Sequence, residues 1–309
     1  MKQRNVLITG GAGFIGIHLC KLLIKKKYNV SVIDNFSIGK IKNIPKNVNI
    51  YKKDILDYNS CVVACKNIDV VIHLAAKVSI RNSVKTFNED VHNNVIGTVN
   101  ILNAAAKTKV KKIILASSMA VYEKSNKKNS FKEKDSLEPL SPYGVSKLAS
   151  EKYILLMAPR MGIDPIVLRL FNTFGPGQTL TPYVGVITIF IKNILNNKIS
   201  RIFGNGNQKR DFVYVDDVAK GFLLAMESKK SVNKIFNIGS GKTISIKKIF
   251  KIIKEKIGKG DYKYCPRDDT ELNYVCADIS KAKKLISFKP QHTFESKINE
   301  VIDQLKSTT

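Results

Sequence analysis

Tyr143 and Lys147 are a residue pair that could carry out acid–base chemistry. Among the eleven tyrosines of the chain, only Tyr143 has a lysine four positions later. In a helix these positions share a face, and an ammonium beside a phenol favours the phenolate by charge attraction. A free phenol titrates near about 10, so it needs such help to act as a base at neutral pH. In a lysine-rich chain this spacing also arises by chance on a surface helix, so the neighbouring residues decide between the two interpretations.

A glycine-rich loop near the N-terminus follows Asn5–Thr9, a short apolar run typical of a strand. Gly10, Gly13 and Gly16 would let the chain turn tightly and bring its backbone against a pyrophosphate. The N-terminus of a helix predicted at Phe14–Lys26 would then face the phosphates. Three glycines can also form only a tight turn. Because strand, loop and helix come in the required order, we predict a dinucleotide site.

Two aspartates at the ends of predicted strands bear on the choice of cofactor. Asp34 lies 18 residues beyond Gly16, where a carboxylate can accept hydrogen bonds from the adenosine ribose hydroxyls. Since it would repel a 2′-phosphate, we expect NAD and not NADP. Asp54 follows the strand predicted at Val48–Lys53 and could reach the adenine. Either aspartate could instead be a turn residue.

Apolar runs alternate with helical patterns through the first part of the chain. Further strands are predicted at Asn29–Asp34, Val48–Lys53, Val70–Leu74, Lys112–Ser117 and Ile166–Leu170. The clearest helical patterns cover Glu89–Lys107 and Tyr143–Met161. Runs that are apolar almost throughout are typical of parallel strands covered on both faces. The pattern therefore predicts an α/β fold with a doubly wound parallel sheet.

The regular alternation ends after Asn172, in a Gly/Pro-rich stretch at 174–178. A helix is predicted at Tyr183–Asn196 and a turn at 204–206, and the chain is expected to return to the sheet through Asp216–Met226 and Ile235–Ile238. Later helical patterns cover Ile246–Ile257, Ser280–Ile286 and Thr293–Leu305. We expect residues 1–172 plus about 212–240 to form the NAD-binding domain. A smaller C-terminal α/β substrate domain would contain about 173–211 plus 241–309.

The bulk composition is that of an ordinary globular protein, with 309 residues of which 44% are apolar. The apolar runs fall short of the about 20 residues that cross a bilayer, and the N-terminus lacks a signal-peptide layout, so a cytoplasmic location is expected. Five scattered cysteines without a Cys-x-x-Cys pair, and four dispersed histidines, suggest neither a disulfide framework nor a metal site.

The formal charge of +27 makes nucleic acid a candidate partner. However, the lysines are spread along the whole chain. The densest stretches, 124–134 and 247–259, do not interleave aromatic residues as a base-stacking surface would. We therefore expect a compositional bias and no nucleic-acid partner, although the charge should attract anionic substrates.

A series of motifs runs in order through almost the whole chain. It comprises Thr9-Gly-Gly-Ala-Gly-Phe-Ile-Gly16, Asp34-Asn-Phe, His73-Leu-Ala-Ala76, Asn94-Val-Ile-Gly-Thr98, Ser117-Ser-Met-Ala-Val-Tyr122, Tyr143-x-x-x-Lys147, Arg169-Leu-Phe-Asn172, Arg210-Asp-Phe-Val-Tyr-Val-Asp-Asp217, Phe236-Asn-Ile-Gly-Ser-Gly241 and Ala277-Asp-Ile-Ser-Lys281. These motifs resemble those of the extended short-chain dehydrogenases/reductases, and within them the NAD-dependent epimerase/dehydratase family. The resemblance implies a Rossmann fold, a UDP-sugar substrate and a homodimer in which the helices matching Glu89–Lys107 and Tyr143–Met161 pair across a two-fold axis.

The resemblance also implies roles for three catalytic residues. Tyr143 would be the acid/base, Lys147 would bind the nicotinamide ribose and lower the pKa of the tyrosine, and Ser118 would hydrogen-bond the reacting sugar hydroxyl. Ser118 could instead be a buried hydroxyl at a strand end. Lowering a phenol pKa from about 10 to about 7 takes about 4 kcal/mol, more than an exposed ion pair supplies. Partial burial and the cofactor charge are therefore expected to contribute.

Contacts to the cofactor and to the sugar nucleotide are implied as well. The implied NAD-binding residues are Gly10, Gly13, Phe14, Ile15, Gly16, Asp34, Asn35, Asp54, Ile55, Leu74, Ala75, Ala76, Asn94, Tyr143 and Lys147. The implied substrate-binding residues are Ser118, Asn172, Arg210, Arg267 and Val275.

Asn172 and Arg210 resemble family residues that contact the diphosphate, for which guanidinium geometry is suited. Arg210 could also be a solvated loop residue. Arg267 matches a second phosphate ligand, although its distance to Ala277 is about one residue longer than in the family. Val275 matches the position that limits the substituent on the sugar C2, and its small size would admit N-acetylated sugars.

The residues after Ser118 bear on the reaction. Related 4,6-dehydratases place an Asp-Glu pair where this chain has Met119 and Ala120, and related decarboxylases place a Glu at the position of Ala120. C4 epimerisation needs neither. We therefore expect an NAD-dependent nucleotide-sugar 4-epimerase acting on UDP-glucose/UDP-galactose or their N-acetyl or uronate relatives. The alternatives are a dehydratase, decarboxylase or reductase of the same family, or a non-catalytic member that senses NAD or binds RNA.

Overall fold

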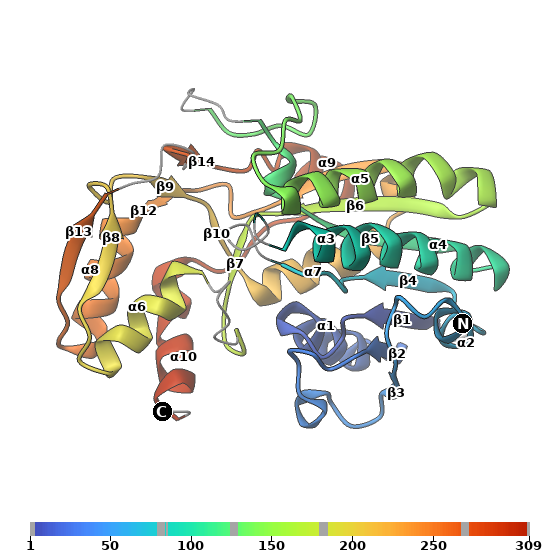
Figure 1. Cartoon of the computed structure of the whole chain (residues 1–309), viewed down its shortest axis with the longest axis horizontal. Coiled ribbons are helices and arrows are strands. Elements are labelled where there is room, and N and C mark those ends of the chain that lie inside the picture. Colours follow the sequence, from blue (N-terminus) through green and yellow to red (C-terminus); the bar gives the residue numbers. More distant parts are fainter. Residues whose placement is uncertain are drawn as a thin grey trace.

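A seven-stranded parallel sheet lies at the centre of the fold (Figure 1). The computed structural model describes residues 4–78, 84, 86–123, 129–178, 185–266 and 272–307. The strands are β1 (Asn5–Thr9), β2 (Asn29–Asp34), β3 (Asn49–Lys52), β4 (Val70–His73), β5 (Lys112–Ser118), β6 (Asp164–Leu170) and β11 (Lys234–Ile238). They follow the order β3-β2-β1-β4-β5-β6-β11, and each neighbouring pair is parallel. The predicted doubly wound α/β fold is confirmed.

Helices cover both faces of this sheet because each strand sends alternate apolar side chains to opposite sides. Val6 and Ile8 belong to one buried cluster, whereas Leu7 belongs to another. The first face is covered by α1 (Phe14–Lys25) and α7 (Val215–Glu227), and the second by α2 (Tyr58–Ala64), α4 (Gly97–Lys107) and α5 (Pro142–Met157).

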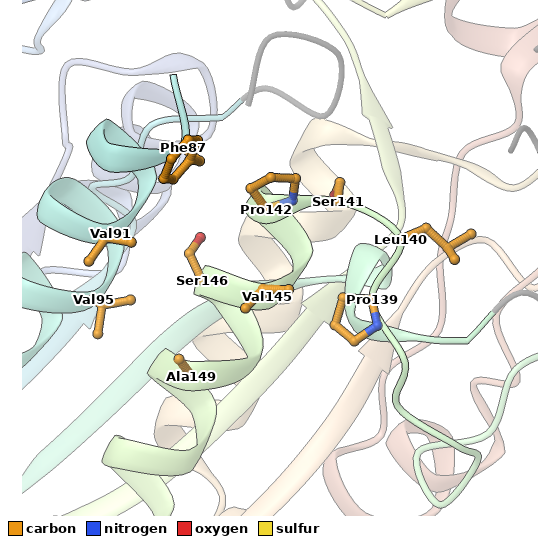
Figure 2. Close-up of a pocket in the computed structure, with 10 residues that line it drawn as sticks. All are labelled: Phe87, Val91, Val95, Pro139, Leu140, Ser141, Pro142, Val145, Ser146 and Ala149. Carbon is orange, nitrogen blue, oxygen red and sulfur yellow. The ribbon is translucent and has the colours of Figure 1, made fainter. Parts of the chain in front are cut away.

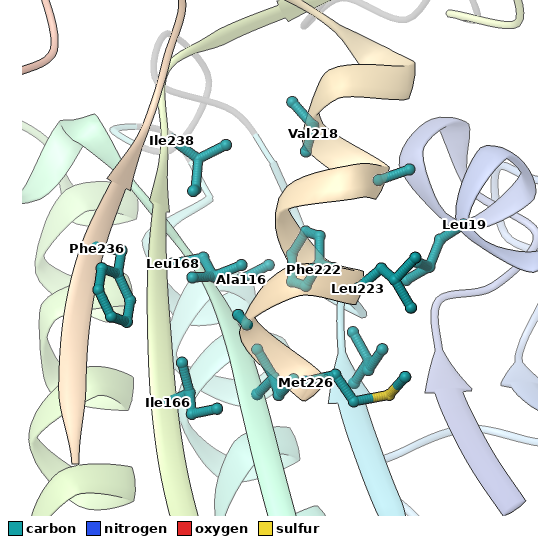
Figure 3. Packing of buried hydrophobic residues seen from close by; sticks show 14 of the residues in the cluster. Leu19, Ala116, Ile166, Leu168, Val218, Phe222, Leu223, Met226, Phe236 and Ile238 are labelled. Atoms are coloured by element: carbon teal, nitrogen blue, oxygen red, sulfur yellow. The ribbon is translucent and has the colours of Figure 1, made fainter. Parts of the chain in front are cut away.

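The chain returns to the sheet through α7 and β11, and the first of these clusters packs both elements against it. In Figure 3, Phe222 and Met226 of α7 point at side chains of the central strands, and Leu19 of α1 lies beside α7. Edge strand β11 contributes Phe236 and Ile238 to the same cluster, and the short helix α9 (Ser280–Ile286) packs beside it. The return expected for residues 216–226 and 235–238 is thus observed.

A second layered region lies beside the sheet, at the left of Figure 1. Its helices are α6 (Val186–Leu195), α8 (Ile246–Ile257) and α10 (Phe294–Lys306), and its strands are β7 (Asn172–Phe174), β8 (Ser200–Phe203), β9 (Lys209–Arg210), β10 (Phe212–Tyr214), β12 (Ile244–Ser245), β13 (Tyr262–Cys265) and β14 (Tyr274–Val275). The apolar faces of the three helices share one buried cluster. Within it, the rings of Phe190 and Phe250 meet edge to face, with centroids 5.3 Å apart.

Some elements differ from the sequence predictions. The helix expected at Glu89–Lys107 is divided into α3 (Phe87–Asp90), a π-helical segment at Val91–Ile96, and α4. The π-helical segment is only six residues long, too short for its own period to be seen within a helical pattern. The expected start of the helix at Tyr183 lies outside the described residues.

Two further observations concern the described residues. None of their helices is long and apolar enough to span a bilayer. They also contain no cluster of three or more His, Cys, Asp or Glu side chains arranged to hold a metal ion.

Candidate active site

The site lies where the strand order of the sheet reverses. From β1 the chain continues to β2 on one side, whereas β4 pairs with β1 on the other. Ligands of doubly wound sheets bind in the crevice at the carboxyl ends of the strands at this point. The glycine loop follows β1 there, and Leu74–Ala76 follow β4.

The glycine loop has the geometry of a cradle for a diphosphate. Gly10 has a φ of +68°, and a Cβ added to it would lie 2.7 Å from the backbone nitrogen of Ala75. A Cβ on Gly16 would lie 2.5 Å from the Gly10 carbonyl oxygen. Gly13 caps α1 without a side-chain hydrogen bond, so no side chain caps the first N–H groups of that helix. This cradle fits the pyrophosphate of NAD.

The two aspartates expected at the adenosine end lie close to this loop. The Asp34 carboxylate accepts from Ala12 N at 2.9 Å and from Phe36 N at 2.8 Å, so it fixes the glycine loop as well as its own turn. Asp54 accepts from the side chain of Asn35 at 2.8 Å. Three of the expected NAD residues, Asp34, Asn35 and Asp54, therefore gather here, and the two carboxylates keep lone pairs for further hydrogen bonds.

Asn94 connects the segment that follows β4 to helix α5. Its side chain accepts from Lys77 N at 2.7 Å, donates to Lys77 O at 3.1 Å, and donates to the Ser146 hydroxyl at 2.9 Å. Ser146 in turn donates to the carbonyl of Tyr143 at 2.8 Å. Asn94 thus holds the segment after Leu74–Ala76 against α5.

His73 lies beneath these contacts with both ring nitrogens bonded. Nδ1 is 2.7 Å from the Thr9 hydroxyl and Nε2 is 2.9 Å from the Thr98 hydroxyl. The Thr98 hydroxyl donates to the Asn94 carbonyl, so it accepts from Nε2–H, and Nδ1 accepts from Thr9. Burial lowers the pKa of His73 to about 3, so the ring is neutral.

Of the remaining expected cofactor residues, Ile55 is buried against α4. Gly97 permits this approach, because a Cβ there would overlap the end of the Ile55 side chain. Phe14 and Ile15 are in the first turn of α1, directly after the glycine loop.

Two of the three residues expected to be catalytic, Tyr143 and Lys147, lie near the start of α5. Ser141 caps this helix by accepting from Gly144 N at 3.1 Å. A Cβ on Gly144 would overlap the carbonyl oxygen of Ala120, so the helix packs directly against the segment that follows Ser118. Tyr143 and Lys147 are both buried, on the helix face that their spacing predicts.

The expectation that partial burial helps to lower the pKa of Tyr143 is wrong. Burial raises the pKa of Tyr143 to about 12, and Asp90 also raises it, while the Ser118 hydroxyl lowers it. Burial therefore opposes the phenolate and does not help to form it, since desolvation penalises the charged form. Burial also lowers the pKa of Lys147 to about 8, which Glu151 partly offsets.

Glu151 is a residue that we did not predict. It lies one helical turn beyond Lys147, with its carboxylate buried, and accepts from the Ser117 hydroxyl at 2.5 Å. Arg169 donates to both of its oxygens, at 2.7 and 2.9 Å. The spacing of 143, 147 and 151 on one helix face was the available signal for Glu151, whereas nothing in the motif at 169–172 indicated that Arg169 would be its partner.

The residues expected to bind the substrate come from separate segments of the chain. The side chain of Asn172 donates to the carbonyl of Asp211 at 3.1 Å. Arg210 stands opposite Val275 in the parallel pairing of β9 with β14, and Val275 is buried. Arg267 lies outside the described residues, so its expected role stays a prediction.

This fold and site agree with a family assignment over most of the chain. Residues 6–239 match the family model described as "NAD dependent epimerase/dehydratase family". The chain belongs to this family and is one of its enzymes.

Individual relatives cover nearly the full length. A putative UDP-glucose 4-epimerase of Methanocaldococcus jannaschii is 41% identical over 98% of both chains. The solved UDP-N-acetylglucosamine 4-epimerase of Methanobrevibacter ruminantium M1, in complex with UDP-N-acetylmuramic acid, is 36% identical with a TM-score of 0.93 over 100% of both chains. The UDP-glucose 4-epimerase of Thermus thermophilus, in complex with NAD, is 29% identical with a TM-score of 0.92, over 99% of this chain and 100% of that one.

The expected family and the expected cofactor, NAD, are therefore confirmed. The nucleotide-sugar 4-epimerase activity expected from the sequence is the activity that these relatives are named for.

Proposed function

We propose that this chain is a UDP-hexose 4-epimerase that oxidises the substrate transiently at C4. The observation that carries the proposal is the burial of Tyr143 and Lys147 on one face of α5, with Ser118 beside the phenol, at the switch point of the sheet. Named relatives of similar length support it.

Three side chains carry out the proposed reaction together with NAD. Tyr143 removes the proton from the C4 hydroxyl, Ser118 hydrogen-bonds that hydroxyl and orients it, and Lys147 supplies a positive charge close to the forming phenolate. Bound NAD supplies the hydride acceptor and donor. The 4-keto sugar then exposes its other face, and Tyr143 returns the proton to the oxygen.

We base the proposed NAD contacts on the geometry of the glycine loop. We infer that Gly10, Gly13 and Gly16 hold the pyrophosphate, and that Asp34 accepts from the adenosine ribose. Residues 1–172 plus about 212–240 would form the NAD-binding domain, with about 173–211 and 241–309 binding the nucleotide sugar. The central sheet, with β11 and α7 included, supports this division.

The residues that follow Ser118 favour epimerisation over related reactions. Elimination of water from C5 and C6 requires an additional acid and base. Met119 and Ala120 occupy the short turn after β5, and neither side chain can transfer a proton. Val275 is the wall proposed beside the sugar C2, and its small side chain favours acceptance of N-acetylated sugars.

Product mass separates these reactions. Purified protein is incubated with UDP-galactose, UDP-N-acetylgalactosamine and UDP-galacturonate, and the products are resolved by liquid chromatography and mass spectrometry. An epimerase gives a product of unchanged mass and altered retention. Loss of water or CO₂ would contradict the proposal, as would the absence of any product from all three sugars. Turnover of UDP-galactose with none of UDP-N-acetylgalactosamine would contradict the assignment of Val275.

We further propose that the active form is a homodimer. A groove of about 560 Å³ lies between the π-helical segment and α5 (Figure 2), and most of its lining is apolar. Val91 and Val145 line it, and each is about half exposed. On the same helix as Val145, Tyr153 and Leu156 are exposed too. A second copy of the chain that paired through this face would bury them.

Light scattering coupled to size exclusion tests the dimer. Wild-type protein should elute at twice the chain mass, and Val145→Glu should elute as a monomer because a charge would be buried at the interface. Exposed Ile199 lies outside this face, so Ile199→Glu is the control. A monomeric wild type would exclude the proposal.

A further inference from the structure

Asp211 is a buried carboxylate that the chemistry above leaves unused. Its Oδ1 accepts from Ser240 N at 2.7 Å and from the Ser240 hydroxyl at 2.6 Å. Its Oδ2 accepts from Gly241 N at 3.0 Å and from Ala277 N at 3.1 Å. Burial raises the pKa of this carboxyl, while these hydrogen bonds lower it. The bonds therefore stabilise an anion without access to solvent.

Asp211 is connected to each of three residues assigned to the substrate. Arg210 precedes it directly in the chain. The Asp211 carbonyl accepts from the side chain of Asn172 at 3.1 Å, and the Asp211 carboxylate holds Ala277, two residues after Val275. Three segments that are distant in sequence thus meet at one residue.

The packing around the carboxylate leaves little freedom. A Cβ on Gly239 would lie 2.8 Å from Oδ2 of Asp211 and 2.6 Å from the Cβ of Ala277. The strands here are only two residues long, and Arg210 pairs with Ile244 on one side and Val275 on the other. Such short strands have few ladder bonds, so side-chain hydrogen bonds must fix their register.

We propose that Asp211 is a positioning residue for the nucleotide-sugar site, which its carboxylate and carbonyl assemble by fixing Arg210, Asn172 and Val275 relative to one another. The ligand class is a nucleoside diphosphate, and the inference rests on the proposed UDP-sugar activity. Asp211 does not touch the substrate. It acts through the residues that do.

UDP binding to the purified enzyme, measured by isothermal titration calorimetry, tests this inference. Asp211→Asn retains one acceptor oxygen where the carboxylate offers two, and its amide group then faces N–H donors. UDP affinity should fall roughly thirty-fold, by the loss of hydrogen bonds to a charged group. Ser240→Ala removes one hydroxyl at the surface of this cluster and should preserve folding, with a loss of roughly three-fold.

Asp217→Asn is the matched control. Asp217 belongs to the same motif, is also buried, and accepts from the backbone nitrogens of Gln291 and His292 at 3.0 Å each. It holds a different segment of the chain, so its substitution should lower stability without weakening UDP binding more than about two-fold. With UDP-galactose as substrate, Asp211→Asn should raise KM and leave kcat within about two-fold.

The outcomes separate this inference from the proposed function. Unchanged UDP affinity in both Asp211→Asn and Ser240→Ala, or an equal loss in Asp217→Asn, would overturn the inference alone. A wild-type enzyme that binds no UDP would overturn the proposed function and this inference with it.

Discussion

Arg169 and Glu151 form a doubly hydrogen-bonded ion pair beside the proposed catalytic residues, with both side chains excluded from solvent. The guanidinium also lies over the ring of Tyr122, 4.8 Å from its centroid. Ser117 donates to the same carboxylate, so the pair ties the end of β5 to α5. The positions of Ser118 and Lys147 therefore depend on this buried ion pair.

Breaking this pair should strongly destabilise the fold. Arg169→Met leaves Glu151 as a buried charge without its ionic partner, at a cost of about 3–5 kcal/mol in the free energy of unfolding. Urea denaturation measures the change. Lys251 and Glu255 form an exposed pair at 3.8 Å on α8, and Lys251→Met should cost about 0.5 kcal/mol or less. Equal costs for the two substitutions would show that burial does not determine how much an ion pair contributes to the free energy of unfolding.

His73 should make stability depend on pH. Its pKa of about 3 in the folded protein is below the about 6.5 of an unfolded chain, so the unfolded state binds the extra proton between these values. This contribution to stability is complete above about pH 6.5 and is lost as the pH falls toward 3, at about 1.4 kcal/mol per pH unit.

Urea denaturation at pH 7 and pH 5 measures this slope. His73→Gln removes the titrating group, so its unfolding free energy should fall less on acidification than that of the wild type. His92→Gln, at an exposed position, should keep the wild-type slope. A His73→Gln slope equal to the wild type would mean that the ring is not held neutral.

Gly10 should be required for NAD binding because there is no space for a Cβ at this position, in addition to its positive φ. Gly10→Ala places a Cβ against the backbone of Ala75 and closes the cradle, so NAD affinity should fall at least about a hundred-fold. Gly162 has a similar φ of +73° and open space around its Cβ position. Gly162→Ala should therefore lose about 1 kcal/mol of stability through its backbone alone.

Fluorescence titration with NADH compares the two glycine variants. Weak binding in Gly10→Ala with normal binding in Gly162→Ala is the expected result. Normal binding in both would argue against the glycine loop as the pyrophosphate site.

The sequence predicted those parts of the fold that local pattern specifies. Apolar runs such as Asn5–Thr9 and Lys112–Ser117 became strands of the sheet, as expected. The two-residue strand β9 and its partners are too short for any periodicity. Helix α2 was not predicted, although Asp57 caps it by accepting from Ser60 N at 3.2 Å.

The residues of the candidate site also fall into those that the sequence predicts and those that only the tertiary fold reveals. Tyr143 and Lys147 are neighbours on one helix, so their spacing could be read directly. Arg169 and Asp211 act through partners that only the tertiary fold brings close, and no spacing rule connects Asp211 to Ala277. The opposing effect of burial on the Tyr143 pKa likewise depends on packing, which a motif does not specify.

The most direct test of the account is turnover at C4 with and without the Tyr143 hydroxyl. Tyr143→Phe and the control Tyr262→Phe, an exposed tyrosine on β13, are incubated with UDP-galactose and UDP-N-acetylgalactosamine, and anomeric proton NMR follows the C4 epimers. Wild type and Tyr262→Phe should convert at least one sugar, whereas Tyr143→Phe should be slower by about 10²–10⁴ while still binding NAD. Conversion by Tyr143→Phe at the wild-type rate would contradict the assignment of Tyr143 as the base, which is the central claim.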